Sequence, residues 1–347
     1  MEIFCHALPK IELHAHLNGS LSKSTLQQLG CTEQKIFKYD CPNTDIKRVF
    51  DLFKVAHSLT NNPTNLYIAT KNVIKEFAQD NVIYLELRTT PRCGKDMSED
   101  EYIETVVRAI MAKDSPRTIM VKLILSLDRK KTHDEQLFTL NNIIKFKKQY
   151  PNIIKGVDLS GDPSKGLFIK ELFQKARNND LFTAIHCGEI KNFKEAREIL
   201  SFLPDRLGHC TFLHPKYCDN SSELWDIYKK LQIPVECCLT SNVRCLTTKS
   251  YEEHHVLEWI AESLPFCLGT DDKGVFDTCL SQEFLIAAKT FNFNKLDLWT
   301  ICRNSVEYSF ASAKEKELLT SKLNQWSIEN MNHDSRNSCP NMKSTLI

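Results

Sequence analysis

The sequence lacks several features that mark particular classes of protein. Its 45 lysine and arginine residues nearly balance its 44 acidic residues, so no general attraction to nucleic acid polymers or anionic membranes is expected. No apolar run reaches the roughly 18 residues that a membrane helix needs. The opening stretch MEIFCHALPK has no basic start followed by an apolar segment, as a signal peptide would. We therefore expect a cytosolic protein without nucleic acid or membrane partners.

Cysteine pairs of the C-x-x-C type are also missing, although the chain has 14 cysteines. The cysteines are scattered over 347 residues, which favours neither a disulfide framework nor a zinc ribbon. We expect them to be reduced and mostly buried as small hydrophobic side chains.

Eight short apolar runs, rich in β-branched residues, alternate with longer amphipathic stretches. The runs cover residues 10–17, 82–90, 118–128, 153–161, 181–189, 205–210, 234–242 and 265–272. Parallel strands need helical crossovers of this kind, so the pattern predicts an α/β fold, a (β/α)8 TIM barrel. Residues 22–80 form a long insertion between the first two strands, where we expect extra helices over one mouth. We expect a single domain over residues 1–326 and a polar, flexible tail over 327–347.

Two histidines stand two residues apart in the first run, KIELHAHLNGS. Side chains alternate along a strand, so His14 and His16 point to one side, while Leu13 and Ala15 point to the other. A lone histidine at a strand end is usually structural. The H-x-H spacing, however, suits two ligands of one metal ion that come from a single strand.

Further polar residues follow other strands, at the barrel mouth where catalytic groups gather. These residues are His186 with Glu189, His209, and Asp271 with Asp272. Imidazole and carboxylate ligands suit zinc, although residue type alone leaves iron and cobalt open. A two-metal hydrolase would need a bridging lysine late in the fourth strand, but Lys155 comes near its beginning. One metal ion is therefore expected.

The motifs HAHLNGS, HCGE, RLGH, LTSN and GTDD stand in the order and approximate spacing of the adenosine deaminase family. The chain resembles this family of metal-dependent barrel hydrolases from about residue 8 to about residue 310. More narrowly, it is similar to the adenosine deaminase-like branch, which removes the N6 substituent of N6-methyl-AMP. The unrelated cytidine-type zinc deaminases require a P-C-x-x-C motif, which this chain lacks.

The resemblance implies a role for each site residue. His14, His16, His186 and Asp271 would hold one Zn2+ per subunit, and His16 would also contact the substrate. Glu189 would donate a proton to purine N1, and His209 would orient or deprotonate the attacking water. Asp272 would bind N7 and the Gly161 N–H would bind N3; Asp128 would contact the nucleotide.

A second group of residues indicates whether the substrate is a nucleoside or a nucleotide, which carries a 5′-phosphate. Relatives that act on adenosine resemble HxHLDG, whereas this chain has Asn18 in place of that aspartate. A neutral amide can donate to a 5′-phosphate that a carboxylate would repel. Further residues for the phosphate site are expected from a loop and from the insertion: Thr89, Thr90, Pro91 and Arg92 in RTTPRC, and His57. The two threonine hydroxyls and the guanidinium would be its donors.

Three functions therefore stay open. The first is zinc-dependent hydrolysis of N6-methyl-AMP and other N6-substituted purine nucleotides to IMP and an amine. The second is deamination of adenosine or AMP. The third is a non-catalytic binding protein on a degenerate barrel, against which the complete set of ligands and acids argues. We expect the chain to act as a monomer on a small purine nucleotide.

Overall fold

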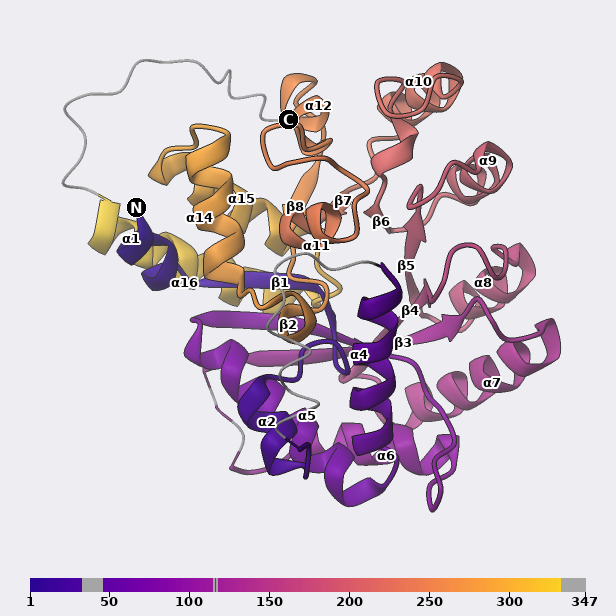
Figure 1. Ribbon diagram of the computed structural model, residues 1–347. Helices are drawn as coiled ribbons and strands as arrows, with labels where there is room; N and C mark the ends of the chain where they lie inside the picture. The colour runs from indigo at the N-terminus through magenta and orange to yellow at the C-terminus, as the bar shows by residue number, and fades with distance from the viewer. Residues whose placement is uncertain (33–45, 115, 117, 332–347) are drawn as a thin grey trace.

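Eight parallel strands form one barrel at the centre of the computed structural model, which describes residues 1–32, 46–114, 116 and 118–331 (Figure 1). The strands pair in chain order: β1 (Lys10–His16), β2 (Val82–Thr89), β3 (Met120–Asp128), β4 (Ile154–Ser160), β5 (Phe182–Cys187), β6 (Arg206–His209), β7 (Val235–Cys237) and β8 (Phe266–Leu268). Beyond β8, a parallel bridge between Ala15 and Asp271 joins the last strand to the first. The predicted (β/α)8 barrel is confirmed.

Helices surround the barrel, as Figure 1 shows. They are α1 (Glu2–Ala7), α2 (Lys23–Gln28), α4 (Ile46–Leu59), α5 (Pro63–Gln79), α6 (Glu99–Ile110), α7 (His133–Gln149), α8 (Lys170–Arg177), α9 (Phe193–Phe202), α10 (Ser222–Leu231), α11 (Leu239–Arg244), α12 (Val256–Ala261), α13 (Lys273–Phe276), α14 (Leu280–Thr290), α15 (Lys295–Tyr308) and α16 (Ala313–Met331). Several begin at residues that cap free backbone N–H groups. Thr132 and Glu135, for example, form a reciprocal capping box at the start of α7.

The insertion between β1 and β2 contains the extra helices that the sequence predicts, namely α2, α4 and α5. Residues 33–45 of the insertion lie outside the described residues. The two ends of the described chain meet, because α1 packs beside α16 through an edge contact of Phe4 with Trp326, whose ring centroids are 5.4 Å apart (Figure 1).

Several expected boundaries differ from the structure by a few residues, and the run 265–272 is a strand only over β8, Phe266–Leu268. Two further differences change the type of structure. The run 234–242 was expected as one strand, but β7 ends at Cys237 and α11 begins at Leu239. In the first turn of α11, the Thr240 N–H donates to Glu283 at 3.0 Å, which gives this free backbone N–H of the helix start a partner. At the other end, α16 continues to Met331, so the first five residues of the expected tail are helical. Residues 332–347 lie outside the described part.

Charged side chains fill part of the barrel interior. Arg206 donates to Glu86 and, at 2.6 Å, to Glu236; its guanidinium carbon lies 3.7 Å from the ring centroid of Phe310. Arg88 Nη2 lies 2.5 Å from the same Glu236. All four charged side chains are fully buried, so their ion pairs and hydrogen bonds form a rigid floor beneath the mouth of the barrel.

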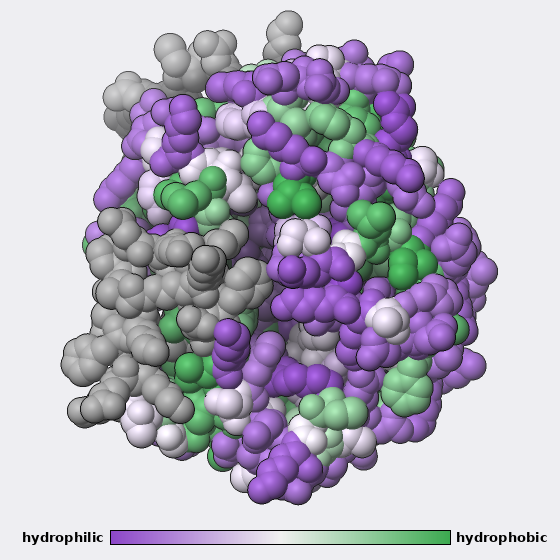
Figure 2. Space-filling view, turned by 45° about the vertical axis from the view of Figure 1, so that its right-hand side comes forward, coloured by the Kyte–Doolittle hydropathy of each residue, from purple (hydrophilic) through white to green (hydrophobic). Residues whose placement is uncertain are grey.

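The outer surface is mainly hydrophilic on the face that Figure 2 shows, where hydrophobic residues form separate spots. Within the described ranges, no helix combines the length and the apolar character needed to cross a membrane.

Candidate active site

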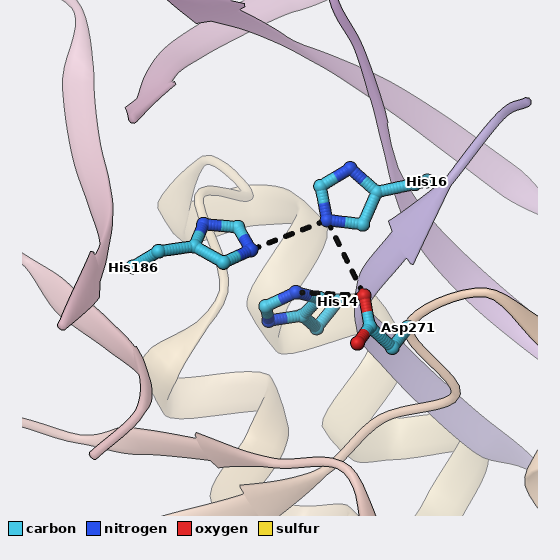
Figure 3. Close-up of side chains that lie close together, drawn as sticks. All are labelled: His14, His16, His186 and Asp271. Carbon is cyan, nitrogen blue, oxygen red and sulfur yellow. Dashed lines mark hydrogen bonds and ion pairs between the residues drawn. The ribbon is translucent and has the colours of Figure 1, made fainter. Parts of the chain in front are cut away.

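Three histidines and an aspartate converge at the mouth of the barrel (Figure 3). His14 and His16 come from β1, His186 comes from β5, and Asp271 follows β8. One nitrogen or oxygen atom of each residue lies within 4.8 Å of the corresponding atom of every other. The sequence predicted these four residues as metal ligands, and the barrel brings all four together.

The histidines present the same ring nitrogen to the centre of this cluster. His16 Nε2 lies 3.3 Å from His186 Nε2, and the Nε2 atoms of His14 and His16 each lie 3.4 Å from Asp271 Oδ1. Asp271 has a left-handed backbone, with φ of 57°, in which an L residue is strained. Its backbone N–H donates to His14 O at 2.7 Å, which holds the strained turn against β1.

Two buried carboxylates lie behind the histidines. His14 Nδ1 is 2.7 Å from Glu236 Oε2, and His186 Nδ1 is 2.8 Å from Asp158 Oδ1. Burial alone would raise the pKa of Glu236, but Arg88, Arg206 and His14 hold it well below its usual range. An ionised carboxylate is an acceptor only, so each Nδ1 donates to it and each Nε2 faces the cluster; in the neutral ring, that Nε2 carries the lone pair that a metal ion needs.

The cluster fits a metal ion by its donor chemistry. Three imidazole nitrogens and one carboxylate suit zinc, and the carboxylates behind two of them are the usual partners of ligating histidines. The buried Nε2 atom of His14 has no hydrogen-bond partner among the described residues. A cation at the centre would be bound by the Nε2 lone pair of a neutral His14 and by Asp271, whose Oδ1 lies 3.4 Å from that nitrogen.

Glu189 and His209 lie beside the cluster. His209 Nε2 is 4.0 Å from Glu189 Oε1 and 3.8 Å from Asp271 Oδ2. Burial raises the pKa of Glu189, which favours a protonated acid, and Glu189 Oε2 has no partner in the described part of the chain. Burial also lowers the pKa of His209, so its imidazole is neutral. The pair can therefore offer one proton donor and one proton acceptor.

Two acids and a glycine line the cavity from two sides: Asp272 follows β8 beside Asp271, whereas Asp128 ends β3 and Gly161 follows β4. Burial, together with Asp271 and Glu189, raises the pKa of Asp272 well above its usual range, and its Oδ1 has no partner among the described residues. Gly161 has φ of 99°, and a Cβ atom there would lie 2.5 Å from Asp128 Oδ1. A protonated Asp272 and a bare Gly161 backbone suit close contact with a flat heterocycle.

Hydrogen-bond donors and one proline, which has no N–H, line the far end of the same cavity, whose volume is about 550 Å3. Asn18 follows β1, and Thr89, Thr90, Pro91 and Arg92 end β2 or follow it, while His57 comes from α4. Arg92 Nη2 donates to Asn18 Oδ1 at 3.2 Å, so the guanidinium and the amide are neighbours. Every residue that the sequence predicted for the site lines this cavity except His14, which is fully buried behind it.

Four residues with a place in the site were missed. Glu236 and Asp158 lie behind the ligand histidines, and Tyr102 and Thr60 lie behind the donors at the far end. Each acid interrupts an apolar strand run, and a buried charge in such a run is a usable signal for a functional site. The sequence carried no comparable sign of a functional role for Tyr102 or Thr60. A tyrosine on the buried face of a helix and a threonine at the end of one are both ordinary structural residues.

Comparison with known proteins agrees with this geometry. The family model described as adenosine deaminase matches residues 9–326. The adenosine deaminase-like protein of Drosophila melanogaster is 39% identical over 94% of this chain and 98% of its own length. A human protein named N6-methyl-AMP deaminase is 38% identical, covering 92% of this chain and 94% of its own.

A solved structure of the Arabidopsis protein ADAL, complexed with IMP, aligns with a TM-score of 0.86 and 33% identity over 95% of this chain and 99% of its own. Fold and sequence thus agree along nearly the whole chain. The chain belongs to the adenosine deaminase family, and it is a hydrolase that acts on C–N bonds of purines.

Proposed function

We propose that this chain hydrolyses N6-methyl-AMP, and related N6-substituted purine nucleoside monophosphates, to IMP and an amine. One observation carries the proposal: a single cavity joins the histidine and aspartate cluster to a group of hydrogen-bond donors at its far end. The human relative named N6-methyl-AMP deaminase and the IMP complex of the Arabidopsis protein support a nucleotide substrate.

One Zn2+ per subunit would be held by His14, His16, His186 and Asp271. When bound, the ion supplies Lewis acidity that makes a water molecule nucleophilic near neutral pH. Asp158 and Glu236 keep the Nδ1 protons of His186 and His14, so that both rings keep their Nε2 lone pairs toward the ion.

The remaining chemistry is proton transfer. As water adds to C6, Glu189 donates a proton to purine N1, which prevents negative charge from building on the ring. His209 orients this water and accepts its proton. The C6–N6 bond then breaks: the amine leaves with the proton that His209 accepted, the C6 hydroxyl returns its proton to Glu189, and the 6-oxo group of IMP remains.

The purine is oriented by three further residues. A protonated Asp272 donates to N7, which is an acceptor only, and the Gly161 N–H donates to N3. Asp128, whose Oδ1 accepts from the Lys130 backbone N–H at 2.9 Å, contacts the nucleotide on the same side of the cavity as Gly161. Holding the ring at these points places C6 against the cluster, which lowers the entropic cost of reaction.

The phosphate subsite is the group of donors formed by Asn18, Thr89 and Arg92, with Thr90, Pro91 and His57 beside it. A guanidinium and two neutral donors match the oxygens of a 5′-phosphate. An aspartate in the place of Asn18 would repel this group.

A substrate panel on zinc-loaded enzyme tests the proposal. N6-methyl-AMP, AMP, N6-methyladenosine and adenosine separate the contribution of the methyl group from that of the phosphate. We expect the highest kcat/KM for N6-methyl-AMP and a loss whenever the phosphate is absent. A clear preference for adenosine would contradict the nucleotide assignment.

We further propose that the enzyme acts as a monomer in the cytosol. This chain itself supplies the proposed ligands His16, His186 and Asp271 and the donors Asn18, Thr89 and Arg92 to one cavity. Buried thiols such as those of Cys187, Cys210 and Cys267 fit a reducing compartment.

A further inference from the structure

We propose that Tyr102 is a positioning residue that sets the direction of the hydrogen bonds in the phosphate subsite, with Thr60 as its counterpart on the other side of Arg92. The inference rests on the proposed function, because it concerns recognition of the nucleotide. Tyr102 belongs to α6 and Thr60 follows α4; both are fully buried and neither lines the cavity. They therefore act through Asn18, Thr89 and Arg92.

The orientation of the Asn18 amide follows from its neighbours. Its Oδ1 accepts from Arg92 Nη2 at 3.2 Å and lies 3.0 Å from Thr60 Oγ1, whose one proton is shared with Ala56 O at 2.8 Å. A guanidinium has donors only, so the amide nitrogen cannot face it. Asn18 Nδ2 must turn the other way, where it donates to the Tyr102 hydroxyl at 3.2 Å.

Only one acceptor is then left for the proton of the Tyr102 hydroxyl. It accepts from Asn18 Nδ2 and, at 3.1 Å, from Arg92 Nη1. Thr89 Oγ1 lies 2.6 Å away and receives the Tyr102 proton. Because Thr89 now accepts from Tyr102, its own hydroxyl proton is released to donate into the cavity that it lines.

Arg92 is held from two sides. Its Nη2 donates to Thr60 Oγ1 at 2.6 Å, and its guanidinium carbon lies 4.9 Å from the centre of the Tyr102 ring. A side chain that is already ordered loses less entropy when it binds a ligand. The second N–H of Asn18 faces Thr89 Oγ1 at 3.4 Å, which is long for a hydrogen bond. This proton and the remaining protons of Thr89 and Arg92 make a group of donors, which suits a phosphate dianion because such a group offers only acceptors.

Tyr102→Phe tests this role, because it removes one oxygen and keeps the ring. Tyr228→Phe is the matched control: Tyr228 is also fully buried, and its hydroxyl accepts from Trp259 at 2.7 Å and donates to Ile233 O at 2.9 Å, away from the cavity lining. Steady-state kinetics would compare N6-methyl-AMP with N6-methyladenosine. We expect the ratio of their kcat/KM values to fall about tenfold to a hundredfold in Tyr102→Phe, mainly through KM, and to stay at the wild-type value in the control.

Thr60→Ala and Thr60→Ser provide a second test that does not depend on the folding of Tyr102→Phe. Serine keeps the hydroxyl that contacts Asn18 and Arg92, so it should retain the substrate ratio that alanine loses. If wild type prefers the nucleotide and neither Tyr102→Phe nor Thr60→Ala changes the ratio, the inference is wrong. A wild type that prefers the nucleoside overturns the proposed function itself.

Discussion

His14 donates from Nδ1 to Glu236 across 2.7 Å, and neither side chain is reached by solvent. Arg88 and Arg206 contact the same carboxylate, so this histidine is oriented by the buried charges of the barrel floor. The ligand cluster and the core of the barrel are therefore one hydrogen-bonded unit.

Glu236→Gln should weaken zinc binding while leaving all four proposed ligands in place. The amide can still accept from His14, but it loses the charge that makes the imidazole a stronger ligand and that pairs with two arginines. We expect zinc affinity to fall by about tenfold to a hundredfold, measured by competition with a chelator. Asp80→Asn is a control, because Asp80 is a hydrogen-bonded, buried acid that contacts Ser281 instead. Equal zinc affinity in both variants would show that Glu236 does not strengthen zinc binding through His14.

Glu189→Gln should retain zinc and lose most turnover, because glutamine cannot supply the proton that N1 requires. We expect kcat to fall by about a hundredfold to ten-thousandfold with zinc content unchanged. His186→Ala, by contrast, removes a ligand and should lose zinc as well. Elemental analysis and rate measurements on both proteins decide the matter, and zinc loss of the same size in both would contradict the division of roles.

Arg92→Ala should impair nucleotides far more than nucleosides. The substitution removes a charged hydrogen bond to the phosphate, so we expect kcat/KM for N6-methyl-AMP to fall about tenfold to a hundredfold more than for N6-methyladenosine. Arg197→Ala is the control, since Arg197 pairs with Glu223 on the exposed surface. A uniform loss for the two substrates would place Arg92 outside the phosphate subsite.

Gly19→Ala should affect both substrates alike. A Cβ atom on Gly19 would lie 1.6 Å from Asp272 Oδ1, so the acid must move away from the position proposed to bind N7. We expect comparable losses of kcat/KM for N6-methyl-AMP and N6-methyladenosine, because both carry the same purine. A loss confined to the nucleotide would argue against the purine contact of Asp272.

The sequence was sufficient to predict the barrel, because strands such as β1 and β3 carry β-branched and apolar residues between clear helical stretches. It was insufficient at residues 239–242. Leu239 is buried whether the backbone is extended or helical, so hydrophobicity alone does not separate the two. The hydrogen bond of Thr240 to Glu283 depends on a residue far along the chain.

The residues of the site likewise include some that the sequence could predict and some that it could not. His14, His16 and Asp271 could be predicted because polar residues at the ends of apolar strands meet at one mouth of a barrel. Tyr102 could not, because a tyrosine on the inner face of an amphipathic helix has the pattern of an ordinary core residue. Its contact with Arg92 arises only when α6 packs beside the loop that follows β2.

The most direct measurement is a crystal structure with IMP, with diffraction data collected on both sides of the zinc absorption edge. We predict one anomalous peak coordinated by His14, His16, His186 and Asp271, with C6 of the purine facing it and the phosphate against Asn18, Thr89 and Arg92. An absent peak, a peak elsewhere, or a phosphate bound away from these donors would contradict the proposed function.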